Sequence, residues 1–121
     1  MLNCVAVGIG GFFGSVARYL ISQIRIKNGT VFPINTFIIN VAGAFALGYV
    51  VAALLRGGNI DPRITLFLKV GVCGGFTTFS TFSLETHELM QTGHMTIAVV
   101  YAAASISFCV LAIFMGQAVA K

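Results

Sequence analysis

The sequence predicts an all-α membrane protein with four transmembrane helices. Of its 121 residues, 58% are hydrophobic and 8% are charged, whereas about a quarter of an ordinary globular chain is charged. Four long stretches carry no charged side chain, and they do not alternate in polarity as the strands of a β-barrel do. A soluble domain of this size leaves much of its surface in water. Most of this surface must therefore face lipid.

The four uncharged stretches are residues 1–17, 31–55, 70–84 and 95–120. A helix needs about 20 apolar residues to cross a bilayer, so the second and fourth stretches are long enough alone. The first must extend past Arg18, whose long side chain can reach toward the head groups. The third must include Lys69 or Glu85. The expected helices cover about 3–24, 33–55, 64–91 and 95–119, because backbone groups in lipid must bond internally.

The connections between the expected helices hold charges and turn formers, including Asn28-Gly29 and Asp61-Pro62. No basic stretch or clear cleavage site marks the first helix as a signal peptide, so we expect it to be retained. Residues 1–121 are therefore predicted to form a single transmembrane domain.

The net charge of +4 does not indicate nucleic-acid binding, because the basic residues are dispersed between apolar stretches. With the N-terminus inside, the basic residues Arg56, Arg63, Lys69 and Lys121 lie inside, and Arg18, Arg25 and Lys27 lie outside. The positive-inside rule then gives almost no orientation. Either one residue outweighs the count, or the chain inserts both ways up.

Small and polar residues mark where these helices should meet. Gly10 and Gly14 lie four apart in the first helix, a spacing that lets helices pack closely. Asn40 lies in the middle of the second, where a buried amide is costly unless it is paired. It either bonds a neighbouring helix or lines a polar path. The widely spaced cysteines Cys4, Cys73 and Cys109 form no disulfide framework.

The strongest local signal is the segment Gly71–Ser83, which joins three glycines to five hydroxyl residues. Glycine and threonine are weak helix formers, so we expect the third helix to break here. Broken helices in membranes commonly mark ion or substrate sites. No enzyme is indicated, because Ser80 has no plausible base nearby and the histidines lack metal-ligand spacing.

The chain resembles the Fluc (CrcB) family of fluoride channels over essentially its whole length. The matching blocks are Gly10-Gly11, Gly14, Arg18-Tyr19, Asn35-Thr36-Phe37, Asn40, Gly43, the run Gly74–Ser83, and Glu85. The third-helix run is the most specific block. This chain departs from the family at Asn35, where glycine is common.

The resemblance implies a fold of four helices with the third broken in mid-membrane, and an antiparallel, dual-topology homodimer. It implies a multi-pass protein of the inner (plasma) membrane that lets fluoride leave the cytoplasm passively and so confers fluoride resistance. A structural sodium ion at the dimer interface is implied as well.

The resemblance also implies roles for individual residues. Asn40 would project into the fluoride path, and Phe79 and Phe82 would offer it their ring edges. The other implied residues are the hydroxyl donors Ser80, Thr81 and Tyr101, the pathway-end carboxylate Glu85, the helix-1 residues Arg18, Gly10 and Gly14, and the sodium-binding carbonyls of Gly74 and Thr77.

Two other functions compete with this interpretation. A small four-helix, proton-coupled drug or cation exporter needs a carboxylate in its first helix, and this chain has none there. A non-transporting membrane assembly subunit would explain the glycines but not Asn40 or the hydroxyl–phenylalanine run.

Overall fold

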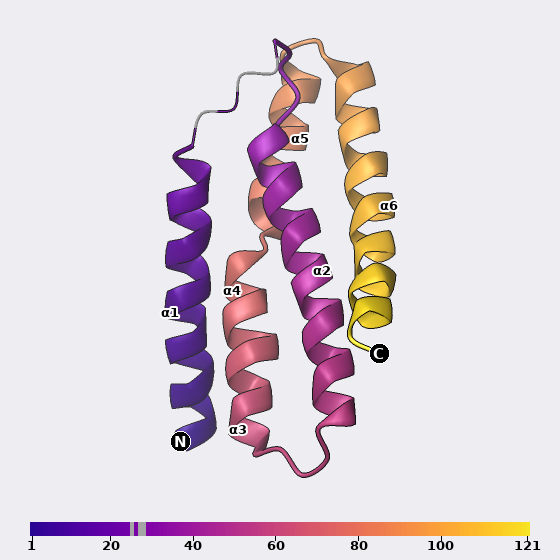
Figure 1. Cartoon of the computed structure of the whole chain (residues 1–121). Coiled ribbons are helices and arrows are strands. Elements are labelled where there is room, and N and C mark those ends of the chain that lie inside the picture. The colour runs from indigo at the N-terminus through magenta and orange to yellow at the C-terminus, as the bar shows by residue number, and fades with distance from the viewer. Residues whose placement is uncertain (25, 27–28) are drawn as a thin grey trace.

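Four long apolar helices run side by side in the computed structural model, which describes residues 1–24, 26 and 29–121 (Figure 1). Each is long and apolar enough to cross a membrane: Leu2–Ser22, Ile34–Arg56, Pro62–Gln91 and Met95–Val119. The described part of the chain contains no β-strand. The prediction of an all-α, four-span architecture is thus confirmed. Arg25, Lys27 and Asn28, which belong to the first predicted connection, lie outside the described residues.

Helix α1 (Leu2–Ser22) packs against the first half of the third span. That half consists of α3 (Pro62–Thr65), the wider π-helical segment η1 (Leu66–Cys73) and α4 (Gly74–Phe76). A Cβ atom on Gly10 would lie 2.9 Å from the Gly71 Cα, and one on Gly14 would lie 2.9 Å from the Phe76 nitrogen. The two backbones therefore approach so closely that only glycine fits at these positions.

Helix α2 (Ile34–Arg56) packs mainly against α6 (Met95–Val119). Glycines again allow the approach, since a Cβ on Gly48 would lie 2.9 Å from the Ile113 Cα and one on Gly116 would lie 2.8 Å from the Tyr49 nitrogen. The molecule is thus two close helix pairs, which meet where α2 contacts η1 and α1. Helix α5 (Phe79–Gln91), the second half of the third span, packs on α6 and α2.

The third span is broken, as the sequence predicts, but the break lies slightly later than the glycine pair. Gly74 and Gly75 remain helical, and the extended residues are Thr77 (ψ 157°) and Thr78 (φ −147°, ψ 116°). The glycines serve packing instead: a Cβ on Gly75 would lie 2.9 Å from the Gly11 carbonyl oxygen. The first half ends at Thr77, and Thr78 begins the second half by capping α5 with its side chain.

Candidate functional site

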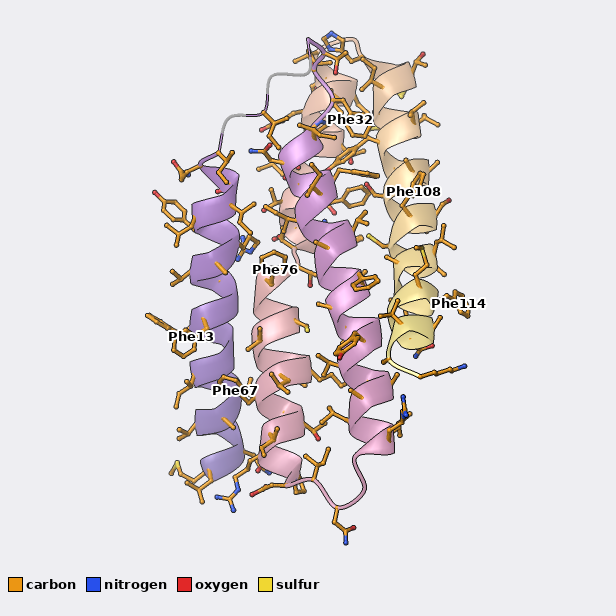
Figure 2. The ribbon with its side chains drawn as sticks, in the orientation of Figure 1. Phe13, Phe32, Phe67, Phe76, Phe108 and Phe114 are labelled. Atoms are coloured by element: carbon orange, nitrogen blue, oxygen red, sulfur yellow. The ribbon has the colours of Figure 1, made fainter. Side chains whose placement is uncertain are left out.

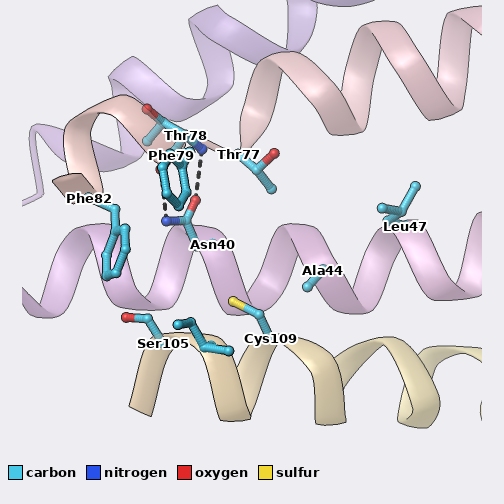
Figure 3. Close-up of a pocket in the computed structure, with 10 residues that line it drawn as sticks. Asn40, Ala44, Leu47, Thr77, Thr78, Phe79, Phe82, Ser105 and Cys109 are labelled. Carbon is cyan, nitrogen blue, oxygen red and sulfur yellow. Dashed lines mark hydrogen bonds between the residues drawn. The ribbon is translucent and has the colours of Figure 1, made fainter. Parts of the chain in front are cut away.

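Asn40 and Thr78 join α2 to the break in the third span (Figure 3). The Asn40 Nδ2 donates to the Thr78 carbonyl oxygen at 3.0 Å, and the Thr78 backbone N–H donates to the Asn40 Oδ1 at 2.8 Å. One amide side chain therefore satisfies both backbone groups of an extended residue, which would be costly to leave unpaired in a membrane.

The hydroxyl of Thr78 starts α5. Its Oγ1 accepts a hydrogen bond from the Thr81 backbone N–H at 3.2 Å, which is the usual arrangement of a helix N-cap. The same oxygen donates to the Thr81 Oγ1 at 3.1 Å and lies 3.3 Å from the Ser80 Oγ. The N-terminal end of α5, with its partial positive charge, is thereby placed in the middle of the third span beside three hydroxyls.

A cavity of about 290 Å³ opens beside the break, between α2, α5 and α6 (Figure 3). Its lining is Asn40, Ala44, Leu47, Thr77, Thr78, Phe79, Phe82, Ser105, Ile106 and Cys109. The lining is mostly apolar, with a few polar groups contributed by the break, α2 and α6. Such a composition is typical of sites that bind small ligands.

The two phenylalanines of the cavity differ in their surroundings. Phe82 is 9% exposed and packs on the buried ring of Tyr101, with ring centroids 5.1 Å apart. Phe79 is 78% exposed, and its ring centroid lies 5.6 Å from that of Phe82. One ring belongs to the core, whereas the other faces outward from the chain.

Glu85 of α5 and Tyr101 of α6 form a separate cluster beside the cavity at the break. The fully buried Tyr101 donates its hydroxyl to the Glu85 Oε1 at 2.9 Å. Thr36 of α2 donates its hydroxyl to the Glu85 Oε2 at 3.0 Å. Glu85 also lines a second cavity, of about 380 Å³, together with Glu88. The carboxylate thus holds α2, α5 and α6 together near one end of the bundle.

Arg18 reaches the break from the opposite side. Its Nε donates to the Gly75 carbonyl oxygen at 3.1 Å, so this guanidinium nitrogen bonds the third span instead of extending to the head groups. Two side chains from different helices, Arg18 and Asn40, therefore hold the backbone on either side of Thr77.

The structure brings some of the predicted site residues together and separates others. Asn40, Phe79, Phe82 and Thr77 line the cavity at the break. Ser80 and Thr81 adjoin it through Thr78 without lining it, and Tyr101 and Glu85 form their own cluster. Gly74 is exposed on the outer face of α4.

Sequence reasoning missed the contributions of Thr78, Ser105 and Cys109. Thr78 belongs to the predicted hydroxyl run, but its two hydrogen bonds with Asn40 depend on where the helix breaks. Ser105 and Cys109 could have been found from their spacing, because Tyr101, Ser105 and Cys109 repeat every four residues and so share one face of a helix.

Comparison with known proteins finds relatives that match nearly the whole chain. The model of the family described as "CrcB-like protein, Camphor Resistance (CrcB)" matches residues 5–117. The fluoride-specific ion channel FluC of Ruminiclostridium cellulolyticum is 46% identical over 122 residues, which cover 100% of this chain and 94% of that protein. The protein of the same name from Chlorobaculum tepidum is 42% identical over 121 residues, covering 100% and 96%.

A further relative of that name, from Methylobacterium radiotolerans, is 40% identical over 120 residues, covering 98% of this chain and 84% of that protein. The matches span all four helices, the break and the cavity lining. The chain therefore belongs to the CrcB-like family.

Proposed function

We propose that this protein is a fluoride-selective ion channel, through which fluoride leaves the cytoplasm passively and fluoride resistance follows. The observation that carries this proposal is the 46% identity, over the whole chain, to a protein named as a fluoride-specific ion channel. All three relatives described above are named as channels and none as an enzyme. The chain is accordingly a multi-pass membrane protein whose task is transport, not catalysis.

The cavity at the break offers what a small, strongly hydrated anion needs. An anion that leaves water must find hydrogen-bond donors or positive potential in its place. The Asn40 amide nitrogen carries two N–H donors, of which one bonds Thr78. The second is available to an anion, as are the positive ring edges of Phe79 and Phe82. The N-terminal end of α5 adds positive potential.

The remaining predicted residues support the path from outside the cavity. Ser80 and Thr81 surround the Thr78 hydroxyl and keep donors at the start of α5. Glu85 lies four residues beyond Thr81 on the same helix α5, where Tyr101 and Thr36 donate hydrogen bonds to it. We assign Glu85 to the end of the pathway, where its carboxylate is occupied by donors and repels an approaching anion less than a free one would.

The proposal includes an antiparallel homodimer in the inner (plasma) membrane. Phe79, Ser80 and Gly74 are exposed on the chain although they lie in the middle of the third span. Polar groups at this depth are costly against lipid, and a second copy packed on this face would cover them. The near balance of basic residues between the two ends agrees with subunits of opposite orientation.

A structural sodium ion between the subunits is part of the proposal. The Thr78 N–H bonds Asn40, so it does not pair with the Gly74 carbonyl as it would in a continuous helix. Carbonyl oxygens suit a hard cation, and those of Gly74 and Thr77 from two subunits would surround one ion. Replacing sodium by a bulky organic cation should then reduce dimer stability and flux; unchanged dimer and flux after prolonged depletion would exclude the ion.

The competing functions fit the molecule less well. The first acidic residue of the chain is Asp61, so α1 and α2 contain no carboxylate to couple transport to protons. A purely structural subunit leaves the Asn40 clamp and the cavity without a role. The drug-exporter alternative is therefore not favoured.

Ion efflux from liposomes tests the proposed function directly. Liposomes that contain the purified protein are loaded with fluoride or chloride, and efflux is recorded with ion-selective electrodes while valinomycin compensates charge. We expect fast fluoride efflux, little chloride efflux and no need for a pH gradient. Protein-free liposomes serve as the control. Equal efflux of the two halides, or a requirement for a proton gradient, would contradict the proposal.

A further inference from the structure

Three cysteines lie in distinct environments, and one of them faces the cavity. Cys109 lies on the face of α6 that lines the cavity, one turn beyond Ser105. Figure 3 shows its sulfur pointing from α6 toward α2. Cys73 is buried between helices, and Cys4 is exposed at the start of α1. The chain thus carries one thiol beside the break, one in the packed interior and one at its periphery.

The Ser105 hydroxyl, one helical turn from Cys109, indicates that the cavity can bind a polar molecule or ion. Ser105 is 6% exposed, lines the same cavity, and its Oγ has no hydrogen-bond partner among the described residues. A buried hydroxyl without a partner costs about 1–3 kcal/mol, so a water molecule or an anion beside it is favoured. The second N–H donor of Asn40 also lies in this cavity and can bond the same water molecule or anion. Cys109, which is partly exposed, therefore lines a cavity whose polar groups favour water.

We propose that Cys109 is a binding site for soft, thiol-seeking metal cations, and that a mercuric ion bound there blocks the anion path. The effect on flux rests on the proposed function, whereas the binding itself does not. Mercuric chloride is a small, uncharged molecule in chloride solution, so an anion-selective path does not exclude it.

The binding step is a ligand exchange without oxidation or reduction. The thiol S–H bond breaks and its proton passes to the buffer, one mercury–chloride bond breaks and chloride leaves, and a sulfur–mercury bond forms. The product is an uncharged sulfur–mercury–chloride group attached to Cys109. This group would occupy the cavity between α6 and α2, beside Asn40 and Phe82, which the proposed function assigns to the anion path.

Flux measurements with matched cysteine variants test the site. For each variant, fluoride efflux from liposomes is expressed as the ratio of rates with and without mercuric chloride. We expect loss of most of the flux for the unaltered protein, Cys4→Ser and Cys73→Ser, with recovery after dithiothreitol. With mercuric chloride, Cys109→Ser and Cys109→Ala should each retain the flux that the same variant shows without it. Equal inhibition of the Cys109 variants would overturn the proposal.

Peptide mapping gives a readout that does not depend on conduction. The detergent-solubilised protein is treated with mercuric chloride, digested and analysed by mass spectrometry under non-reducing conditions. We expect mercury on Cys4 and Cys109 before Cys73, in the order of their accessibility. Cys109 left unmodified while Cys73 reacts would refute the site. If the protein conducts no fluoride yet Cys109 binds mercury, the proposed function fails and the site stands.

Discussion

Asn40 uses one amide for two tasks, because it bonds both backbone groups of Thr78 and keeps an N–H donor for the cavity. A leucine at this position would have the same branched arrangement of heavy atoms and neither group. An aspartate would keep the acceptor for the Thr78 N–H but lose the donor and add a negative charge. Both substitutions therefore remove the N–H donors, and only the aspartate keeps an acceptor for the Thr78 backbone.

We expect Asn40→Leu to lower both stability and fluoride flux, with a stability loss of about 2 kcal/mol from two lost hydrogen bonds. Asn40→Asp should also lose the flux, and its carboxylate, which would face the Thr78 carbonyl oxygen at membrane depth, should lower stability as well. Thermal unfolding of the detergent-solubilised protein and liposome efflux measure the two effects. Ile38→Leu, at an exposed position of the same helix, is the control. Normal flux in Asn40→Asp would show that the amide N–H is not used by the ion.

Phe79 and Phe82 allow ring chemistry to be separated from packing. Isoleucine keeps apolar bulk but has no positive ring edge, so Phe79→Ile and Phe82→Ile should both suppress fluoride efflux. Stability should fall more in Phe82→Ile, by about 0.5–1.5 kcal/mol, because that ring packs on Tyr101 as well as on Phe79. Phe114→Ile provides the control, since Phe114 is 66% exposed and points away from the bundle (Figure 2). Unaltered efflux in both variants would mean that the two rings only pack and do not contact the ion.

Among the elements, the third span depends most on its neighbours. Its first half is held by α1 through close backbone packing and the Arg18–Gly75 hydrogen bond. Its second half is held by α2 and α6 through Asn40, Thr36 and Tyr101. The break is thus stabilised by contacts with three other helices and not by its own sequence alone.

The glycines of α1 permit a test of this packing. Gly14→Ala should destabilise the protein by about 1–3 kcal/mol, because the added methyl group meets the backbone of η1 and α4. Gly8→Ala is the matched control, since a Cβ at Gly8 has no atom within 4 Å. Thermal unfolding of the two variants in the same detergent gives the comparison. Equal melting temperatures would mean that α1 is less closely packed than the structure has it.

The spans and the existence of the break could be predicted because they depend on local composition. Charges delimit the apolar stretches, and the Gly71–Ser83 segment is poor in helix formers. The position of the break could not be predicted, because it depends on tertiary contacts. Gly75 remains helical where it meets Gly11, and Thr78 becomes extended where it meets Asn40. These contacts join residues far apart in the chain, and residue-type propensity does not contain them.

The cavity lining was predictable in part for the same reason. Asn40, Phe79 and Phe82 stand out as a polar residue and aromatic rings in unusual places. Ser105 is an ordinary small residue in an alanine-rich helix, and only the neighbouring α2 shows which face it occupies. The partnership of Tyr101 with Glu85 likewise requires the packing of α6 on α5.

For the whole molecule, the two termini lie toward the same end of the bundle, as an even number of spans requires (Figure 1). The Arg56 side chain donates to the Ala120 carbonyl and so ties the C-terminal end to α2. A tag after Lys121 therefore reports the orientation of the entire chain.

We expect a C-terminal tag to be found on both faces of the membrane in active wild-type protein. The basic residues are nearly balanced, so their count predicts almost no preferred orientation. Two lysines added beside Lys121 should bias the orientation and lower fluoride flux, because antiparallel pairs become scarce. Protease protection in sealed inverted vesicles measures the distribution, and two added serines are the control. Exclusive one-sided protection of active protein would argue against pairing of opposite orientations.

The two extended threonines also have a mechanical consequence. A continuous helix transmits tilt from one membrane surface to the other, but the third span is interrupted at Thr77 and Thr78. Because α4 is held mainly by α1, and α5 by α6 and α2, each half can follow its own neighbours when the bilayer thins or thickens. We expect the third span to bend at these two threonines when the bilayer thickness changes. The tilt of each half would then vary separately with the length of the lipid chains.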